Sequence, residues 1–331
     1  MMKAHVLEEI GKLNLKEVEV PENKGGWTLV KVKAAGICGS DIPRIYKTGA
    51  HRHPLIPGHE FSGEVVATGK RVGIFPLIPC GTCECCQEKK YEMCRNYNYL
   101  GSRCDGGFAE YVLVPEWNLI PLPDSVSYET AAMLEPMAVA VHAIRQVKVG
   151  PEEKVAVCGL GTIGLFVTMF LHANGVKNLI AIGNKNSQKE AIKNIGEEIT
   201  FIDTRVENLT EKVDVFFECV GKNETITSAI EAVRPGGRVQ LVGNPASDML
   251  LEKPIYWKIL REQLTLFGTW NSSFTREETD DWHYVISLLE KGEIHPEKMI
   301  THRFPLEDLE KGLIIMRDKT EEYIKVMITN W

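Results

Sequence analysis

The first part of the chain is built from short runs in which apolar and polar residues alternate. Leu29–Ala34 and Phe108–Val114 are two such runs, and glycine and proline residues interrupt the sequence between them. A period of two residues is typical of strands that bury one face. We therefore predict that residues 1–143 form a strand-rich domain with long loops.

Residues 144–269 follow a different pattern, in which apolar strands alternate with amphipathic helical stretches. The strands are expected at Lys154–Cys158, Asn178–Ile182, Val213–Phe217, Arg238–Val242 and Leu264–Phe267. Strands that are separated by helices form parallel sheets with right-handed crossovers. The pattern predicts a Rossmann-type, doubly wound parallel sheet for this domain.

The remaining segment, residues 270–331, is too short to form a third domain. It holds one helical stretch, Trp282–Leu289, and one strand-like run, Tyr323–Ile328. We expect it to return to the first domain and complete it. The predicted fold class is therefore α/β, with a β-rich domain joined to a doubly wound sheet.

Composition and charge agree with an ordinary soluble protein and exclude two classes of partner. Of the 331 residues, 44% are hydrophobic and 25% are charged. A net charge of -7 argues against nucleic-acid binding, which needs clustered lysine and arginine. No apolar run reaches the ~18 residues of a membrane span, and the chain start turns acidic too early for a secretory signal. We expect a cytoplasmic protein.

Five of the nine cysteines lie within residues 80–94, and four of them, Cys80, Cys83, Cys86 and Cys94, form a candidate ligand set. The odd total favours metal ligation in a reducing compartment over disulfide bonds. Four thiolates at this spacing close a tetrahedral shell around Zn²⁺, which predicts a structural zinc site. An iron–sulfur cluster is the alternative, but the run lacks the short final gap and the Cys-Pro pair of that motif. Cys85 is the spare thiol.

A second set of metal-ligand types is dispersed over Cys38, His59, Glu60 and Glu135. Glu135 is informative, because an ionised carboxylate within an apolar run is costly unless a cation compensates it. Three protein ligands of mixed type with an open fourth position are typical of catalytic zinc. Taken singly, Cys38 could be a small buried residue and His59 a loop residue. Together with a nucleotide-binding motif, the set predicts a catalytic metal site.

A glycine-rich turn that contains Gly159, Gly161 and Gly164 directly follows an apolar strand. The helix predicted after it, residues 162–174, ends at Gly175, which is suited to a left-handed cap. Gly159 permits the tight turn, Gly161 lets a pyrophosphate approach the backbone, and Gly164 allows close helix–sheet packing. An ordinary strand–helix turn is the alternative. The context favours a dinucleotide bound at the helix N-terminus.

The end of the next predicted strand indicates which dinucleotide binds. NAD-binding forms carry an acid there that accepts hydrogen bonds from the ribose, whereas this chain has Gly183, Asn184 and Lys185. A small residue followed by a donor and a cation makes room for a 2'-phosphate and can pair with it. We therefore expect NADP(H) to be favoured, with NAD(H) held by other groups as the alternative.

The stretch from Gly58 to Val72 fits the pattern G-H-E-x2-G-x5-G-x2-V. Because of this motif, the chain resembles the zinc-containing medium-chain dehydrogenases. The resemblance covers nearly the whole chain and implies a GroES-like catalytic domain, a Rossmann domain, and a homodimer or homotetramer. The Glu135-Pro136 pair is similar to the polyol and threonine dehydrogenases of that family. The loop after Gly69 is shorter than is usual there.

The same resemblance implies roles for individual residues. Cys38, His59 and Glu135 would hold the metal. Glu60 would be an alternative ligand or a neighbour of the ligands, and Ser40 would be the first hydroxyl of a proton relay. The implied reaction transfers a hydride from a secondary alcohol to a nicotinamide.

Cationic side chains in the first domain favour a small-molecule substrate, which we expect to be a polyol or a polyol phosphate that resembles a sugar phosphate. A polyol needs donors and acceptors at several points, and a phosphate is best bound by a guanidinium. The candidates are Arg44, His51, Arg52, His53 and Arg103. Three alternatives stay open: solvated loops at these positions, threonine or a simple secondary alcohol as substrate, and a non-catalytic NADPH-binding protein.

Overall fold

The structure is a computed structural model that describes residues 1–329, among which no helix is long and apolar enough to cross a bilayer. The chain forms two compact units. Unit 1 comprises Met1–Glu135, Ser273–Gly292 and the stretch from Met299 onward, and unit 2 comprises Pro136–Ser272 and Glu293–Lys298. The helix α4, Leu134–Val147, runs without a break through residue 143, where the sequence pattern placed a boundary.

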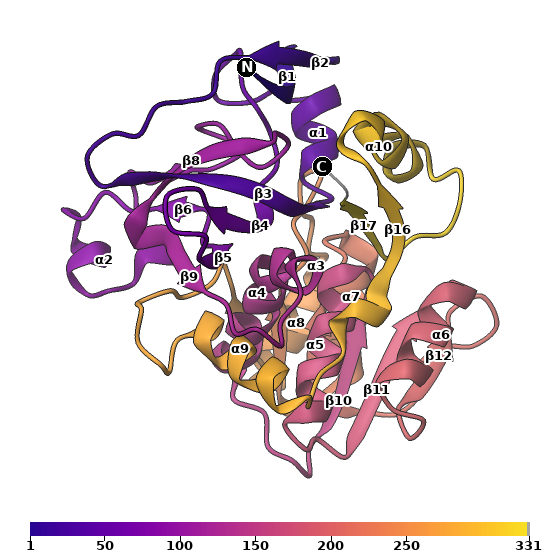
Figure 1. Ribbon diagram of the computed structural model, residues 1–331. Coiled ribbons are helices and arrows are strands. Elements are labelled where there is room, and N and C mark those ends of the chain that lie inside the picture. Colours follow the sequence, from indigo (N-terminus) through magenta and orange to yellow (C-terminus); the bar gives the residue numbers. More distant parts are fainter. Residues whose placement is uncertain (330–331) are drawn as a thin grey trace. The chain divides into compact units, whose positions relative to one another are not determined.

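Unit 1 is organised around a seven-stranded sheet. Its strands are, in spatial order, β16 (Ile300–Phe304), β17 (Lys325–Ile328), β3 (Trp27–Ile37), β4 (Glu60–Val65), β5 (Arg71–Ile74) and β9 (Leu119–Pro121), with β8 (Tyr111–Pro115) paired to β3. Strand β17 pairs antiparallel with β3, so that Val326 lies opposite Ile37. Figure 1 shows these two strands together although they come from opposite ends of the sequence.

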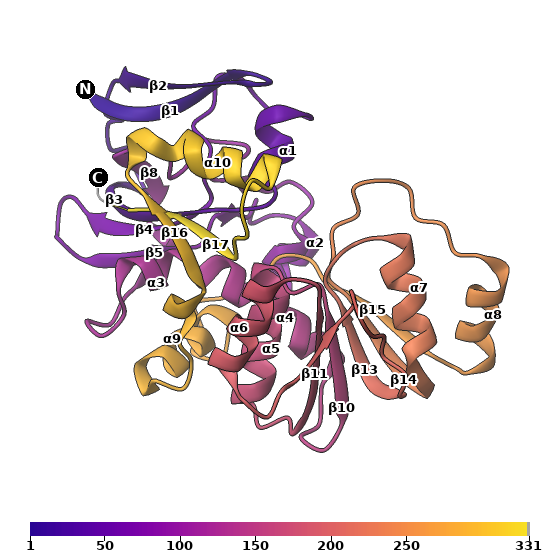
Figure 2. The same ribbon diagram turned by 90° about the vertical axis from the view of Figure 1, so that its right-hand side faces the viewer.

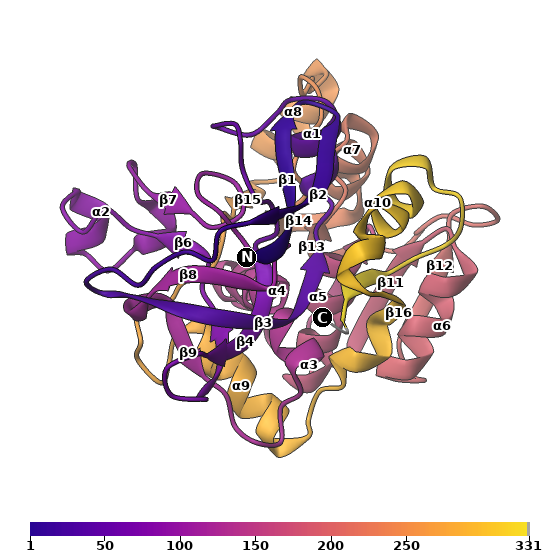
Figure 3. The same ribbon diagram turned by 45° about the horizontal axis from the view of Figure 1, so that its top comes forward.

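Shorter elements surround this sheet. β1 (Met2–Glu9) and β2 (Lys12–Val18) form the hairpin seen in Figure 3, and β6 (Leu77–Ile78) pairs with β7 (Asn98–Tyr99). The helical elements are α1 (Asp41–Tyr46), α2 (Glu84–Gln87), η1 (Tyr91–Met93), η2 (Glu116–Asn118), α3 (Tyr128–Ala132), α9 (Asp281–Lys291), η4 (Leu306–Asp308) and α10 (Leu309–Asp318), while η3 (Pro296–Met299) lies almost wholly in the second segment of unit 2. Phe61 and Phe108 are buried in the core, where a phenylalanine contributes about 1.5–3 kcal/mol.

The return segment holds more structure than its sequence pattern predicted. Besides α9 and β17, it contains the strand β16 and the helix α10, and the prediction of a single helix in this segment was wrong. Helix α10 buries Leu309, Leu313 and Met316, a helical spacing. Charged residues at Glu310, Lys311 and Arg317 conceal this pattern in the sequence.

Unit 2 is a six-stranded parallel sheet, which confirms the predicted doubly wound fold (Figure 2). In spatial order the strands are β12 (Thr200–Asp203), β11 (Asn178–Gly183), β10 (Lys154–Cys158), β13 (Val213–Glu218), β14 (Val233–Leu241) and β15 (Thr265–Gly268). The helices are α5 (Thr162–Ala173), α6 (Asn186–Ile195), α7 (Asn223–Ala232) and α8 (Lys253–Arg261). Strand order reverses at β10, where ligands of such sheets bind beyond the carboxyl ends of the strands.

Candidate metal centres and nucleotide-binding turn

The loop between β6 and β7 brings four sulfur atoms together, those of Cys80, Cys83, Cys86 and Cys94. Cys83 Sγ lies 3.5 Å from Cys86 Sγ and 3.9 Å from Cys94 Sγ. All four are free thiols, and Cys85 does not belong to the cluster. Four convergent sulfurs without an intervening side chain of another type fit a closed, tetrahedral zinc site.

Hydrogen bonds favour the thiolate form of one of these four cysteines. The backbone and the hydroxyl of Thr82 stabilise the thiolate of Cys80 and lower its pKa to about 5. Burial raises the pKa of the Cys86 thiol to about 12. Because the thiolate is the form that binds metal, Cys80 is ready to ligate at neutral pH, whereas Cys86 loses its proton when a cation is bound.

A second cluster joins Cys38, His59 and Glu60, whose ligand atoms all lie within 4.8 Å of one another. Cys38 directly follows β3, His59 directly precedes β4, and Glu60 is the first residue of β4. The antiparallel register that places Gly36 opposite Glu60 sets this meeting point. His59 and Glu60 are buried, with 4% and 2% of their surface exposed. A thiol, an imidazole and a carboxylate in this arrangement fit an open zinc site with three protein ligands.

Glu135, at the start of α4, faces this cluster but is not one of its three members. Burial raises the pKa of its carboxyl to about 7, and the charges of His59 and Glu60 act on it as well. Its Oε1 accepts a hydrogen bond of 3.1 Å from the hydroxyl of Tyr99. The two carboxylates predicted as ligands therefore lie near the same point and have different partners.

Lys325 on β17 is the partner of Glu60, and the sequence analysis did not identify it. Its ammonium forms a buried ion pair with Glu60 Oε2 and donates to the carbonyl of Ile37 at 3.3 Å. A Cβ atom on Gly36 would lie 2.3 Å from Glu60 Oε2 and 2.6 Å from Lys325 Cε, so only glycine leaves room for the pair. The available signal was a lysine inside an apolar strand, which requires a compensating charge.

Asp41 is a second residue that sequence reasoning missed. It is fully buried, and its Oδ1 lies 3.4 Å from His59 Nδ1. It also accepts hydrogen bonds from the Cys38 amide at 3.0 Å and from Arg44 at 2.5 Å. Burial alone would lower the pKa of His59, but the charges of Asp41 and Cys38 raise it well above its usual value. A carboxylate behind a histidine fixes the orientation of the ring for metal binding.

Ser40 and Arg44 lie around the same cluster. The Ser40 hydroxyl donates to Cys38 Sγ at 3.3 Å and is half-buried, so it can exchange a proton with a group bound beside the sulfur. One edge of the Arg44 guanidinium is engaged by Asp41. Arg44 therefore supports the histidine through Asp41 in this structure.

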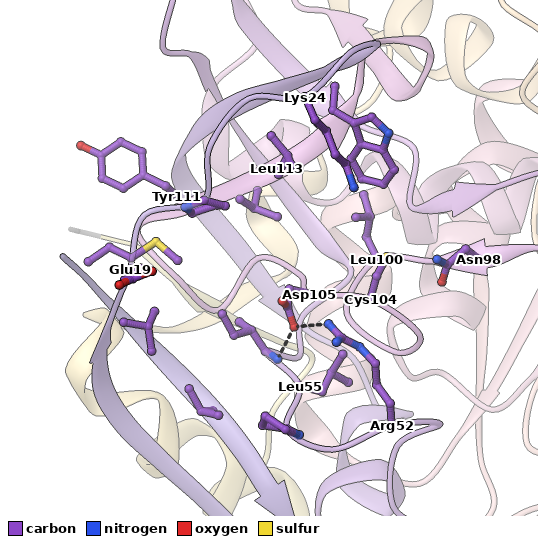
Figure 4. Close-up of a pocket in the computed structure, with 18 residues that line it drawn as sticks. Glu19, Lys24, Arg52, Leu55, Asn98, Leu100, Cys104, Asp105, Tyr111 and Leu113 are labelled. Atoms are coloured by element: carbon purple, nitrogen blue, oxygen red, sulfur yellow. Dashed lines mark hydrogen bonds and ion pairs between the residues drawn. The ribbon is translucent and has the colours of Figure 1, made fainter.

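Three of the other cationic candidates lie on the surface. His51, Arg52 and His53 are exposed. Arg52 pairs with Asp105 at 2.8 Å and lines a hollow of about 500 Å³, whose lining includes none of the predicted metal ligands (Figure 4). Arg52 therefore lines a hollow that contains none of the residues of the second cluster.

Arg103 is connected to the cluster through two tyrosine rings. Its guanidinium lies over the ring of Tyr97 at 4.6 Å, and its buried Nε has no hydrogen-bond acceptor among the described residues. Tyr97 contacts Tyr99 edge to face, with ring centroids 6.1 Å apart. The ring of Tyr99 approaches His59 in the same way, at 5.9 Å. An unsatisfied guanidinium donor that is linked to the cluster by contacting rings is suited to an anionic ligand group.

The glycine turn of unit 2 has the geometry that a dinucleotide site needs. Gly159 has a φ of +95°, and a Cβ there would lie 2.5 Å from Val220. A Cβ on Gly164 would lie 2.2 Å from the carbonyl oxygen of Gly159. Gly161 is the N-cap of α5 and has open space beyond its Cα. The turn therefore presents an uncovered helix N-terminus, which fits a pyrophosphate.

The edge where β11 ends carries cations and amides. The amides of Asn184 and Lys185 both donate to Gln188 Oε1, at 2.9 and 3.2 Å. The acid at this edge, Asp203 on β12, is paired with Arg205 at 2.6 Å, which lowers the pKa of Asp203 to about 2. Gly183 thus ends β11 beside an acid whose charge is already compensated.

Comparisons with known proteins agree with both units. The alcohol dehydrogenase GroES-like domain matches residues 24–124, and the zinc-binding dehydrogenase domain matches residues 162–291. Galactitol 1-phosphate 5-dehydrogenase of Escherichia coli is 32% identical over 330 residues, which cover 94% of this chain and 95% of that protein. L-threonine 3-dehydrogenase of Escherichia coli is 30% identical over 326 residues, which cover 91% and 92%. The crystal structure of galactitol-1-phosphate dehydrogenase from Escherichia coli has a TM-score of 0.90 at 32% identity, with 99% and 100% of the two chains covered.

Proposed function

Because the chain belongs to the zinc-binding alcohol dehydrogenases with a GroES-like domain, we propose that it oxidises a secondary hydroxyl of a polyol or polyol phosphate to the ketose. The chain is a zinc-type, NAD(P)-dependent oxidoreductase. The observation that carries the proposal is the buried cluster of Cys38, His59 and Glu60 with Glu135 beside it. A cluster of this kind suits a substrate that binds through oxygen.

Each side chain around the cluster has a role in the proposed reaction. Cys38, His59 and Glu60 would hold the catalytic zinc, with Glu135 as the alternative carboxylate. When bound, zinc polarises the alcohol oxygen and favours its deprotonation. Ser40, whose hydroxyl lies 3.3 Å from Cys38 Sγ, accepts the alcohol proton and passes it outward. A dinucleotide held at the turn of Gly159, Gly161 and Gly164 would supply the hydride acceptor that this oxidation needs.

The four-cysteine loop supports stability in this proposal and takes no part in the chemistry. Its sulfurs would enclose a second zinc, which leaves no position for substrate. The helices of this loop, α2 and η1, are both short. Free thiols of this kind favour a reducing compartment such as the cytoplasm.

A polyol phosphate is favoured as the substrate class by the position of Arg103. Its buried Nε has no acceptor among the described residues, and its guanidinium is held against Tyr97. A planar guanidinium binds phosphate with two parallel hydrogen bonds. Threonine or a simple secondary alcohol is the alternative substrate, and neither would use this cation in the same way.

NADP(H) is favoured as the cofactor by the residues that follow β11. Gly183 carries no carboxylate, Lys185 supplies a cation, and Arg205 compensates Asp203 at the same edge. These residues can accept a 2'-phosphate, which a free carboxylate would repel. NAD(H) bound through other groups is the alternative.

A homodimer, or a tetramer built from it, is favoured by an apolar surface on unit 2. Seven exposed large apolar side chains of unit 2 lie on α8 or close in sequence to α8 and the edge strand β15; they are Met249, Leu250, Leu251, Tyr256, Trp257, Leu260 and Trp270. Contiguous apolar surface beside an unpaired strand edge is a common site of association. Size-exclusion chromatography with light scattering of the wild type and of Leu260→Asp tests this, and a wild-type monomer would contradict it.

One experiment tests the proposed reaction. The zinc-loaded enzyme is assayed on galactitol 1-phosphate, sorbitol, threonine and 2-butanol, each with NADP and with NAD. We expect the highest kcat/KM for a polyol or its phosphate with NADP. Robust activity on threonine or 2-butanol alone would contradict the substrate class. Zinc binding without single-turnover hydride transfer to any of these would favour the non-catalytic alternative.

A further inference from the structure

We infer that Tyr99 is a positioning residue that decides which of two carboxylates, Glu60 or Glu135, serves as the metal ligand. The inference rests on the metal site of the proposed function. It goes beyond that site because it assigns a role to a residue that is not in the proposed ligand set and lies on a separate element, the short strand β7.

The backbone of Tyr99 is fixed from two sides. It pairs with Leu77 in the short sheet of β6 and β7. Its carbonyl oxygen accepts hydrogen bonds from the amides of the turn that follows, those of Ser102 at 3.3 Å, Arg103 at 2.8 Å and Cys104 at 3.2 Å. A residue held in this way can set the position of a neighbouring side chain with little freedom of its own.

The side chain of Tyr99 is directed at the cluster. Its hydroxyl donates to Glu135 Oε1 at 3.1 Å, and its ring meets that of His59 at an interplanar angle of 61°. The hydrogen bond engages one oxygen of Glu135 and orients the carboxylate toward the tyrosine. A hydrogen bond to a charged group stabilises by about 1.5–3 kcal/mol, enough to shift the preference between two orientations roughly ten- to a hundredfold.

Glu60 is held by a different partner from that of Glu135. Its Oε2 is paired with Lys325, which also donates to the carbonyl of Ile37. Its ligand atom remains within 4.8 Å of those of Cys38 and His59. Lys325 thus keeps Glu60 in the ligand set, while Tyr99 holds Glu135 outside it. Removal of the Tyr99 hydroxyl frees Glu135 to join or replace Glu60.

A double-mutant cycle on metal affinity tests this inference. Glu60→Gln and Glu135→Gln are made in the wild type and in Tyr99→Phe, and zinc dissociation constants of the second site are measured by chelator competition. In the wild type we expect Glu60→Gln to weaken binding ~10–100-fold, as loss of a metal-site group does, and Glu135→Gln to have a much smaller effect. In Tyr99→Phe the cost of Glu60→Gln falls and that of Glu135→Gln rises.

The visible spectrum of the cobalt-substituted protein gives an independent readout. We expect Tyr99→Phe to change the position or intensity of the d–d bands, because the ligand set changes, and Tyr97→Phe to leave them as in the wild type. Tyr97 is the matched control, since it lies in the same segment and contacts the ring of Tyr99. Tyr99→Leu, which also lacks the donor, repeats the test if Tyr99→Phe folds poorly.

Three outcomes would overturn the inference. Additive effects in the cycle with an unchanged cobalt spectrum would show that Tyr99 does not select the carboxylate. Greater dependence on Glu135 than on Glu60 in the wild type would reverse the assignment. If wild-type protein holds zinc only in the four-cysteine loop, the proposed metal site itself fails, and the inference fails with it.

Discussion

Lys325 and Glu60 form a buried ion pair across a sequence separation of 265 residues. The order of β17, β3 and β4 in the sheet brings them together, and Gly36 between them provides the space. The pair places a positive charge beside the carboxylate that we propose as a metal ligand. The return segment therefore contributes to the electrostatics of the centre as well as to the sheet.

Lys325→Met should destabilise the metal-free protein by about 3–5 kcal/mol, because it leaves the carboxylate of Glu60 buried without its partner. Urea unfolding of the wild type and the variant measures this difference. Lys311→Met is the control, since Lys311 and Asp308 form an exposed ion pair worth ~0–1 kcal/mol. Equal losses in the two variants would contradict the role of Lys325.

Asp41→Asn should weaken zinc binding at the second cluster ~10–100-fold, because the carboxylate that orients His59 is lost. Chelator competition in the folded protein measures the change. Asp105→Asn serves as the control, since Asp105 pairs with Arg52 away from the ligands. An affinity for zinc that stays within threefold of the wild type in Asp41→Asn would speak against this role.

Cys83→Ser should lower the zinc content from about two ions to about one per chain and reduce the melting temperature, because a closed site needs four ligands. Elemental analysis and calorimetry provide the measurements. Cys85→Ser is a close control, because Cys85 lies in the same helix region outside the cluster. Iron with visible absorbance in the wild type would overturn the zinc assignment.

Arg103→Ala should raise KM for a phosphorylated polyol about ten- to a hundredfold, as loss of a charge-assisted contact does, and should change KM for the unphosphorylated parent far less. Arg44→Ala should instead weaken metal binding, because Arg44 holds Asp41. Arg52→Ala is the surface control. Steady-state kinetics on both substrates decides, and an equal loss on both in Arg103→Ala would count against phosphate recognition.

Lys185→Ala should lower kcat/KM for NADP by about ten- to a hundredfold relative to NAD, since it removes a charged donor to the 2'-phosphate. Asn184→Asp should shift preference the same way by adding an acid. Gly183→Asp is a poorer test, because a Cβ there would lie 3.0 Å from Leu160 Cδ1. Lys193→Ala, farther along α6, is the control, and a wild type that prefers NAD would refute the proposal.

Sequence periodicity was sufficient to predict the strand-rich unit and the parallel sheet of the second unit. Strands β10 and β11 match their predicted runs because fully buried parallel strands are continuous apolar segments. Strand β12 escaped notice, since only Phe201 and Ile202 of its residues are apolar. Local pattern thus identified five strands of the six-stranded sheet, including the edge strand β15, and missed the edge strand β12.

The residues of the candidate site also include some that the sequence could predict and some that it could not. Spacing within one loop indicated the four sulfurs, and the structure brings them together. Lys325 and Tyr99 could not be associated with the second cluster from the sequence, because their contacts depend on which strands become neighbours. Asp41 was within reach, since it follows Cys38 by three positions and could have been recognised as a support for a ligand.

The dependence of Glu60 on Lys325 also sets an order of assembly during synthesis. The four-cysteine loop is complete once Cys94 has been made, so it can take up zinc while most of the chain is still untranslated. The other centre lacks its ammonium until β17 emerges and pairs with β3. A nascent chain would therefore be able to bind the proposed structural ion before β17 is made, and would complete the proposed catalytic centre only after β17 has left the ribosome.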